Sequence, residues 1–304
     1  MLSFRDIALA IQSQFNSLDL SAVPIAGERD PASASPLILL SPPRTGSTLV
    51  YQYLIDSFRL AFISNIMSLL PRHMLAIQRL QRRIARCRHT NLHAGHYGFV
   101  PGLCAPSEAG KVLDRWFAEE QPGEYVRTVQ QLTIALERQW GQPLIIKAPS
   151  LSLHAEQVSR IFPAARIILL TRDPAFIAQS ILIGRTNRHI PDEQWLGVEP
   201  SGYRQQAARG LVYQTVWQVR EILRALDDNI MPAVRVDYTD FCADPKKSIH
   251  EIAKSCNMEP NVRLHQLPDH FDAADSIRVD TATWSEIIRS CDELGLVSGS
   301  REST

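Results

Sequence analysis

Four short runs of consecutive apolar residues, each followed by a turn and a helical pattern, constrain the fold of this chain most strongly. The runs lie in Pro36–Leu40, Pro143–Ile146, Arg166–Leu170 and Ala233–Val236. Because their apolar residues are continuous rather than alternating, the runs are typical of strands buried on both faces, as in parallel sheets. Helical patterns lie near residues 46–58, 71–87, 107–119, 123–139, 152–161, 174–184 and 204–226. This alternation predicts an α/β fold, a central parallel β-sheet flanked by helices, with ligands at the carboxyl ends of the strands.

The composition limits the class of protein and of ligand. The chain has 304 residues, with 32 basic and 32 acidic side chains and a formal net charge of +0. This balance argues against a protein that coats nucleic acid or anionic lipid through its global charge, but it permits a local pocket for an anion. The five cysteines have no paired metal-ligand spacing, which is typical of reduced thiols in a cytosolic chain. There is no signal-peptide pattern and no apolar run of the ~18 residues that a membrane span needs, so we expect a cytoplasmic protein.

The first apolar run leads into residues 41–48 (SPPRTGST) and then a helical pattern. A strand, a tight loop and a helix N-terminus together favour phosphate, because backbone N–H groups, hydroxyls and the helix dipole all stabilise an anion. The segment overlays the P-loop pattern GxxxxGK[ST], but Ser41 replaces the first glycine and Ser47 replaces the lysine. Without that lysine the loop is poorly suited to γ-phosphate chemistry, and Arg44 supplies the positive charge instead. The alternative is an ordinary hydroxyl-capped helix after a turn.

A second anion-binding pattern follows the third apolar run, at residues 171–174 (TRDP). Asp173 suits a helix N-cap and Pro174 the first helical position, which leaves Arg172 at the tip of the strand. Ser180 lies about two helical turns further along. An arginine at a strand end and a hydroxyl on the next helix can hold a second phosphate. The alternative is a surface ion pair between Arg172 and Asp173, with a polar serine on the helix.

These segments resemble the sulfotransferases that use 3′-phosphoadenosine 5′-phosphosulfate (PAPS). PPRTGST is similar to their 5′-phosphosulfate loop and TRDPxxxxxS to their 3′-phosphate motif, and the segment between them looks like the bacterial and tyrosylprotein branches. VRVDYTDF is similar to the family's YEDL segment, with Asp240 kept and Thr239 where glutamate is common. The resemblance implies a P-loop-like three-layer fold in one domain over residues 1–304. Residues 1–35 would form an N-terminal helix and connector, 36–258 the nucleotide-binding core, and 259–304 a segment that closes over the nucleotide.

The resemblance also implies which residues bind PAPS, the co-substrate. The 5′-phosphosulfate would be bound by Arg44, Thr45, Gly46, Ser47 and Thr48, and the 3′-phosphate by Arg172 and Ser180. Tyr238 matches a tyrosine that contacts adenine in relatives, and Arg278 a basic residue that closes over the nucleotide. The alternatives are a core aromatic residue for Tyr238 and an ordinary surface arginine for Arg278.

Sulfuryl transfer needs charge stabilisation on the leaving oxygen and a base for the acceptor proton. Lys147, at the end of the second apolar run, and Arg44 are the expected cations; a lysine that merely extends from a strand tip is the alternative. No metal-ligand set is evident, and the family's reaction needs none. Pro149 stands where the cytosolic small-molecule sulfotransferases have a catalytic histidine. Other branches use a glutamate from the segment between the two phosphate motifs, and the start of the helical pattern over 107–119 resembles the PxE turn of bacterial relatives. The resemblance therefore implies Glu108 as the base. A carboxylate that only interacts with the helix dipole is the alternative reading of Glu108, and His93, His96 and His154 are the other candidates for the base.

The basic helical pattern from Arg72 to Arg88 is either a solvated face or a basic wall beside the cleft for an anionic acceptor. Nucleic acid is not expected, because no aromatic residues interleave with these arginines. The acceptor would be a small molecule, saccharide, lipid or peptide, and an oligomer is compatible with the sequence. A P-loop kinase or nucleoside triphosphatase, and a non-catalytic nucleotide-binding module, are the alternative functions.

Overall fold

The computed structural model describes residues 30–83, 99–229, 233–262 and 264–298. At its centre is a five-stranded sheet in the order β2-β3-β1-β4-β5, in which all neighbouring strands are parallel. The strands are β1 (Leu37–Leu40), β2 (Ala61–Phe62), β3 (Leu144–Lys147), β4 (Arg166–Thr171) and β5 (Ala233–Asp237). The predicted α/β fold with a parallel sheet is confirmed, and the four apolar runs form β1, β3, β4 and β5.

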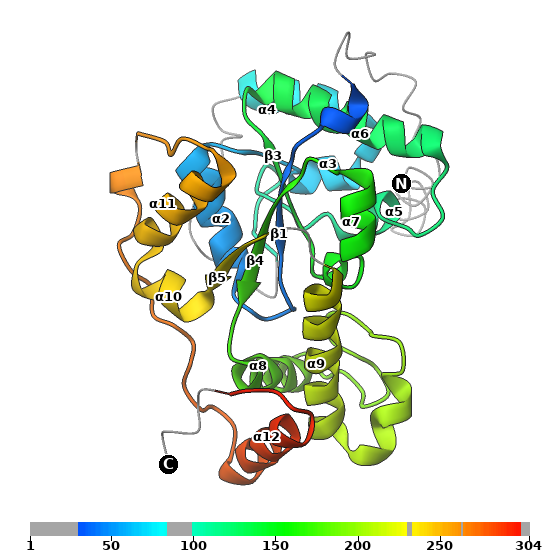
Figure 1. Ribbon diagram of the computed structural model, residues 1–304, viewed down its shortest axis with the longest axis vertical. Helices are drawn as coiled ribbons and strands as arrows, with labels where there is room; N and C mark the ends of the chain where they lie inside the picture. Colours follow the sequence, from blue (N-terminus) through cyan, green and yellow to red (C-terminus); the bar gives the residue numbers. More distant parts are fainter. Residues whose placement is uncertain (1–29, 84–98, 230–232, 263, 299–304) are drawn as a thin grey trace, which may run out of the picture.

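The continuous apolar runs are explained by burial of both faces of the sheet. In β1, Leu37 and Leu39 belong to one hydrophobic cluster, whereas Ile38 and Leu40 belong to another on the opposite face. The first face is covered by α2 (Ser47–Phe58), α10 (Tyr238–Ala243) and α11 (Pro245–Cys256). The second is covered mainly by α5 (Gly110–Trp116), α6 (Gly123–Trp140) and α7 (Ala155–Ile161). The result is the expected arrangement of three layers (Figure 1).

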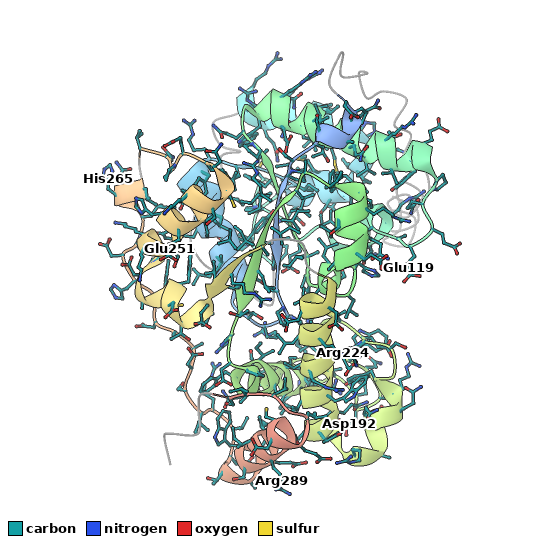
Figure 2. The ribbon with its side chains drawn as sticks, viewed as in Figure 1. Glu119, Asp192, Arg224, Glu251, His265 and Arg289 are labelled. Atoms are coloured by element: carbon teal, nitrogen blue, oxygen red, sulfur yellow. The ribbon has the colours of Figure 1, made fainter. Side chains whose placement is uncertain are left out.

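A third cluster extends the molecule beyond the carboxyl end of β4. It is formed by α8 (Pro174–Asn187), α9 (Leu211–Asn229) and α12 (Thr281–Glu293). Helix α9 joins this cluster to the rest of the molecule, since Val216 packs in the third cluster and Ile222 in a cluster of the sheet. Charged side chains such as Glu119, Arg224 and Glu251 are exposed and lie at the periphery (Figure 2). Among all the residues that the structure describes, no helix is both long enough and apolar enough to cross a membrane.

The helix expected over residues 107–119 is shorter, and this changes the setting of Glu108. Helix α5 begins at Gly110, because the preceding Ala109 has a left-handed backbone with φ 48°. Glu108 therefore lies in the loop before the helix, and its alternative interpretation as a first-turn carboxylate is wrong.

Two other expected helices are interrupted. The pattern over 152–161 is divided between a 3-10 helix, η4 (Pro149–Leu153), and α7. The pattern over 204–226 is divided between η5 (Arg204–Arg209) and α9 at Gly210, whose φ is 89°. The further elements are α3 (Asn65–Leu69), α4 (Met74–Arg83), η1 (Pro31–Ser33), η2 (Pro71–His73) and η6 (Leu264–Gln266). The expected N-terminal helix and the end of the basic pattern, residues 84–88, lie outside the described residues.

Candidate functional site

A cavity of about 740 Å³ lies at the carboxyl ends of the central strands, where ligands of open α/β sheets bind. The structure brings nearly all the expected site residues to its lining, although they come from separate segments of the chain. The expected residues in the lining are Arg44, Gly46, Ser47, Thr48, Glu108, Lys147, Arg172, Ser180, Tyr238 and Arg278. Thr45 is the exception: its side chain is fully buried, and its hydroxyl donates to the carbonyl of Pro42 at 2.7 Å. The Thr45 hydroxyl therefore stabilises the loop from within.

The loop between β1 and α2 has the conformation of an anion cradle. Arg44 and Gly46 both have positive φ, 69° and 90°. A Cβ added to Gly46 would lie 2.2 Å from Cε2 of Tyr238, so only glycine fits between the loop and that ring. Gly46 is also the N-cap of α2 and provides no side-chain bond to the helix. The amides of Leu49 and Val50 donate to the Gly46 carbonyl, which leaves the N–H groups of Ser47 and Thr48 at the start of α2 for an anion at the cavity.

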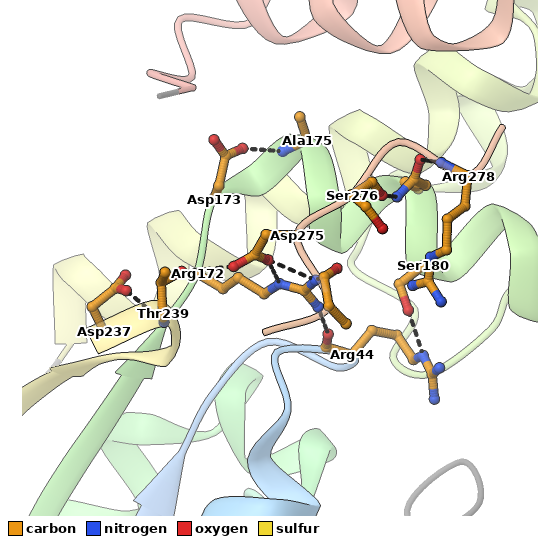
Figure 3. A network of polar contacts seen from close by, with 12 residues as sticks. Arg44, Arg172, Asp173, Ala175, Ser180, Asp237, Thr239, Asp275, Ser276 and Arg278 are labelled. Carbon is orange, nitrogen blue, oxygen red and sulfur yellow. Dashed lines mark hydrogen bonds and ion pairs between the residues drawn. The ribbon is translucent and has the colours of Figure 1, made fainter. Parts of the chain in front are cut away.

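Arg172 ties the two anion-binding patterns together. As predicted, Asp173 caps α8 by accepting from the Ala175 amide at 2.8 Å, which leaves Arg172 at the end of β4. The buried Arg172 guanidinium donates through Nη1 to the Arg44 carbonyl at 3.0 Å and lies 4.8 Å from the centre of the Tyr238 ring. Arg172 forms its ion pair with Asp275, which is distant in sequence, at 2.9 Å (Figure 3). The alternative expectation of an ion pair with Asp173 is therefore wrong.

Ser180 and Arg44 complete the connection between the two patterns. Arg44 Nε donates to Ser180 Oγ at 3.1 Å, although the two residues are far apart in sequence (Figure 3). Arg278 also lines the cavity, and its side chain extends toward Ser180 in the same view. Three arginines from different parts of the chain therefore surround one space, and an anion there would gain from all of them.

Lys147, at the end of β3, is buried and reaches the same cavity. Its Nζ contacts the carboxylate of Glu108 and donates to Thr48 Oγ1 at 3.3 Å. Burial and the nearby charge of Arg44 lower the pKa of Lys147 to about 7. The Glu108 carboxylate acts in the opposite direction, because it stabilises the ammonium form. The expected base and the expected cation are therefore direct partners.

The other candidates for the base are not in this cavity or cannot be placed. His154 stands at the start of α7 and does not line the cavity. His93 and His96 lie outside the described residues. Of the two expected bases among the described residues, Glu108 and His154, the structure brings Glu108 to Lys147.

The described part of the basic pattern, residues 72–83, does not line this cavity. It is carried by η2 and α4. Arg79 donates to Gln139 at 2.7 Å, and Arg82 lines a different cavity beside Trp140. The basic wall beside the acceptor cleft therefore stays a prediction, and its described arginines lie away from this cavity.

Sequence reasoning missed several residues of the site. Asp275 holds Arg172, and Asp114 lines the cavity with its Oδ1 accepting from Ser150 Oγ at 2.5 Å. Asn187 and Arg188, at the end of α8, line it as well. Lone polar residues of this kind carry no local motif, so only the three-dimensional arrangement identifies them. Among the described residues, no group of three or more His, Cys, Asp or Glu side chains is placed to hold a metal ion.

One solved structure supports the assignment of the fold. Sulfotransferase STF9 from Mycobacterium avium superposes with a TM-score of 0.54 at 16% identity, over 96% of this chain and 82% of that chain. Sulfotransferase STF1 from Mycobacterium tuberculosis H37Rv gives a TM-score of 0.47 at 15% identity, over 86% and 76% of the two chains. Curated protein sequences give no match. The model of the Sulfotransferase family matches residues 36–261, which span β1 to the end of α11 and so most of the chain, and the chain belongs to that family.

Proposed function

We propose that this chain transfers a sulfuryl group from PAPS to a hydroxyl or amine of an acceptor. The observation that carries the proposal is the meeting of two anion-binding motifs at one cavity, through the contact of Arg44 with Ser180 at 3.1 Å. A nucleotide with phosphates on both its 5′ and 3′ oxygens requires two such sites side by side. A nucleoside triphosphate requires only the first, and the loop has Ser47 where its lysine would be.

The residues present fit such a nucleotide. The cavity volume of about 740 Å³ lies in the range of small-molecule sites, roughly 300–1,000 Å³. Arg44, Lys147, Arg172 and Arg278 line it with positive charge. Gly46 lets the loop approach the Tyr238 ring, with which a Cβ would clash. In this assignment the loop before α2 and its first N–H groups hold the 5′-phosphosulfate, and Arg172 with Ser180 holds the 3′-phosphate.

The chemistry follows from the two groups that meet at the end of β3. PAPS supplies an activated sulfuryl group when it is bound. Lys147 and Arg44 offset the negative charge that develops on the phosphate side of the breaking bond. Glu108 accepts the proton of the attacking hydroxyl or amine, and its contact with Lys147 fixes its position. We assign the acceptor to the polar side of the cavity near Asp114 and Ser150.

The binding part of the proposal is tested with adenosine 3′,5′-bisphosphate, by isothermal titration calorimetry. Arg44→Ala removes a charged donor and should weaken the nucleotide about ten- to a hundred-fold, whereas Ser180→Ala, which removes a neutral hydroxyl, should have a smaller effect. Arg79→Ala on α4 is the matched control, because Arg79 does not line the cavity. Unchanged affinity in Arg44→Ala would contradict the assignment of the loop.

The alternative functions give different results in two further measurements. A ligand at 100 times its Kd stabilises a protein by about 2.7 kcal/mol, so thermal shifts rank the nucleotides directly. Stabilisation by ATP or GTP but not by the bisphosphate would favour a kinase or nucleoside triphosphatase. Binding of the bisphosphate without transfer from sulfur-labelled PAPS to any component of a metabolite extract would favour a non-catalytic module.

A further inference from the structure

The side chain of Gln179, on α8, is completely buried and uses both ends of its amide on one distant segment. Its Nε2 donates to the carbonyl of Ser276 at 2.9 Å, and its Oε1 accepts from the amide of Arg278 at 2.7 Å. The segment lies roughly a hundred residues further along the chain (Figure 3). An amide that donates to one residue and accepts from another fixes the register of the backbone between them.

Residues 271–280 form neither helix nor strand, so the position of this segment depends on its contacts with other elements. Residues at the junction of β4 and α8 hold it at two successive points. Arg172 pairs with Asp275 at 2.9 Å and also donates to the carbonyl of Ala274, and Gln179 then holds the backbone of Ser276 and Arg278. Exposed backbone without regular structure otherwise has considerable conformational freedom.

The position that Gln179 fixes is that of a residue lining the cavity. Arg278 is exposed, yet it lines the cavity opposite the loop of Arg44. On α8, Ser180 faces the cavity and contacts Arg44, while its neighbour Gln179 is buried against the segment that carries Arg278. A shift of the segment by one residue would turn the Arg278 side chain away from Ser180. Two adjacent residues of α8 therefore connect the segment with the anion site: Ser180 contacts Arg44, and Gln179 binds the backbone of Arg278.

We propose that Gln179 is a positioning residue, which holds Arg278 over the nucleotide and thereby sets the affinity for the donor. This rests on the function proposed above. Neither end of the amide is dispensable: methionine keeps the length and loses both hydrogen bonds, and glutamate keeps the acceptor but turns a carboxylate oxygen toward the Ser276 carbonyl. The Ser276 carbonyl therefore loses its side-chain donor in both variants, and the Arg278 amide loses its acceptor in the methionine variant.

The experiment measures the Kd of adenosine 3′,5′-bisphosphate by calorimetry, together with the urea midpoint of unfolding. Gln179→Met and Gln179→Glu should each weaken the nucleotide about ten-fold or more, as should Arg278→Ala. The matched control is Gln130→Met, because Gln130 is also buried and donates to a backbone carbonyl, that of Ile161, away from the cavity. This control should lower the urea midpoint while it leaves the Kd within about two-fold.

A double variant separates positioning from a general loss of stability. If Gln179 acts through Arg278, Gln179→Met should weaken binding by less than about two-fold in the Arg278→Ala background. Full additivity of the two changes, or wild-type affinity in Gln179→Met, would overturn the proposal. Arg278→Ala changes an exposed side chain and so tests the same idea if the Gln179 variants do not fold: unchanged affinity there also overturns it. Failure of the wild-type protein to bind the bisphosphate would refute the proposed function, and this inference with it.

Discussion

Replacement of Glu108 by glutamine should move the pH range in which the enzyme works, because Glu108 is the contact that keeps Lys147 charged. Burial and Arg44 lower the pKa of Lys147 to about 7, and the carboxylate of Glu108 opposes that lowering. In the proposed function the ammonium is the form that stabilises the leaving phosphate, so we expect transfer to be lost as the pH rises through the pKa of Lys147. In Glu108→Gln the opposing charge is gone, and this loss should begin at lower pH.

The size of the shift follows from the contact. Two unit charges about 4 Å apart interact by about 4 kcal/mol at an effective dielectric constant near 20, which corresponds to about three pKa units. Lys147 is 2% exposed but Glu108 is 24% exposed, so water screens part of this energy. We therefore expect the alkaline limb of kcat to move to lower pH by about one to two units. Below that limb, kcat should still be lower by about 100-fold or more if Glu108 is the base.

Steady-state sulfuryl transfer from PAPS between pH 5 and 9 measures both effects in one series. Glu119→Gln removes an exposed carboxylate at the periphery and is the control for the change of total charge (Figure 2). An alkaline limb at the wild-type position would refute the electrostatic reasoning about Lys147. Wild-type turnover below the limb would exclude Glu108 as the base while leaving the electrostatic reasoning intact.

Two further predictions concern the same cavity. Gly46→Ala places a Cβ 2.2 Å from the Tyr238 ring at a φ of 90°. The variant should therefore be destabilised by about 1–3 kcal/mol or more in urea unfolding, and should not bind the bisphosphate. The control is Gly123→Ala, because a Cβ at Gly123 meets nothing within 4 Å. Equal midpoints for the two variants would contradict the steric argument. Lys147→Met should abolish transfer yet stabilise the free protein at neutral pH. Folding lowers the pKa of Lys147 from 10.5 to about 7, so the unfolded state binds an additional proton between these pH values. The free energy of unfolding of the wild type should therefore decrease as the pH falls from about 10 toward 7, whereas that of the variant should not. The same pH dependence of unfolding in both proteins would refute the assignment of a lowered pKa to Lys147.

The strands were predictable where burial of both faces leaves a mark in the sequence itself. Continuous apolar residues mark β1, β3 and the centre of β4, because both faces of these strands are buried. The pattern is weaker in β5, where Val236 is buried but Arg235 is exposed and pairs with Asp227. The edge strand β2 was not predicted, since Ala61–Phe62 is too short to form a pattern. A signal for α11 was present: Asp244 before Pro245 is an N-cap followed by a proline at the first helical position, and Asp244 indeed accepts from the Lys247 amide at 2.9 Å.

The site was predictable to the extent that its residues follow strand ends. Arg44 and Arg172 are adjacent to β1 and β4, and parallel strands place their carboxyl ends at one edge, so local patterns were enough to bring them together. Their partners come from the far C-terminal segment and the buried side of α8. Asp275 and Gln179 belong to no local motif, and their contacts span about a hundred residues. Such contacts depend on how the layers pack against one another, and no periodic pattern in a single sequence predicts that packing.

Positive and negative side chains are paired within the site, as they are balanced over the whole chain. A buried charge without a partner is energetically costly, so a fold that buries cations beside a cavity stabilises them with counter-charges. Here Lys147 has Glu108 and Arg172 has Asp275, and in both pairs the cation is the buried member: 2% and 4% exposed, against 24% and 19% for the carboxylates. The carboxylates therefore retain access to water. In the proposed function we expect a phosphate to approach each buried cation while its carboxylate stays in place, because the carboxylate remains hydrated at the edge of the cavity. At the end of β3 the Glu108 carboxylate thus favours the ammonium form of Lys147, against the burial that lowers the pKa of this lysine.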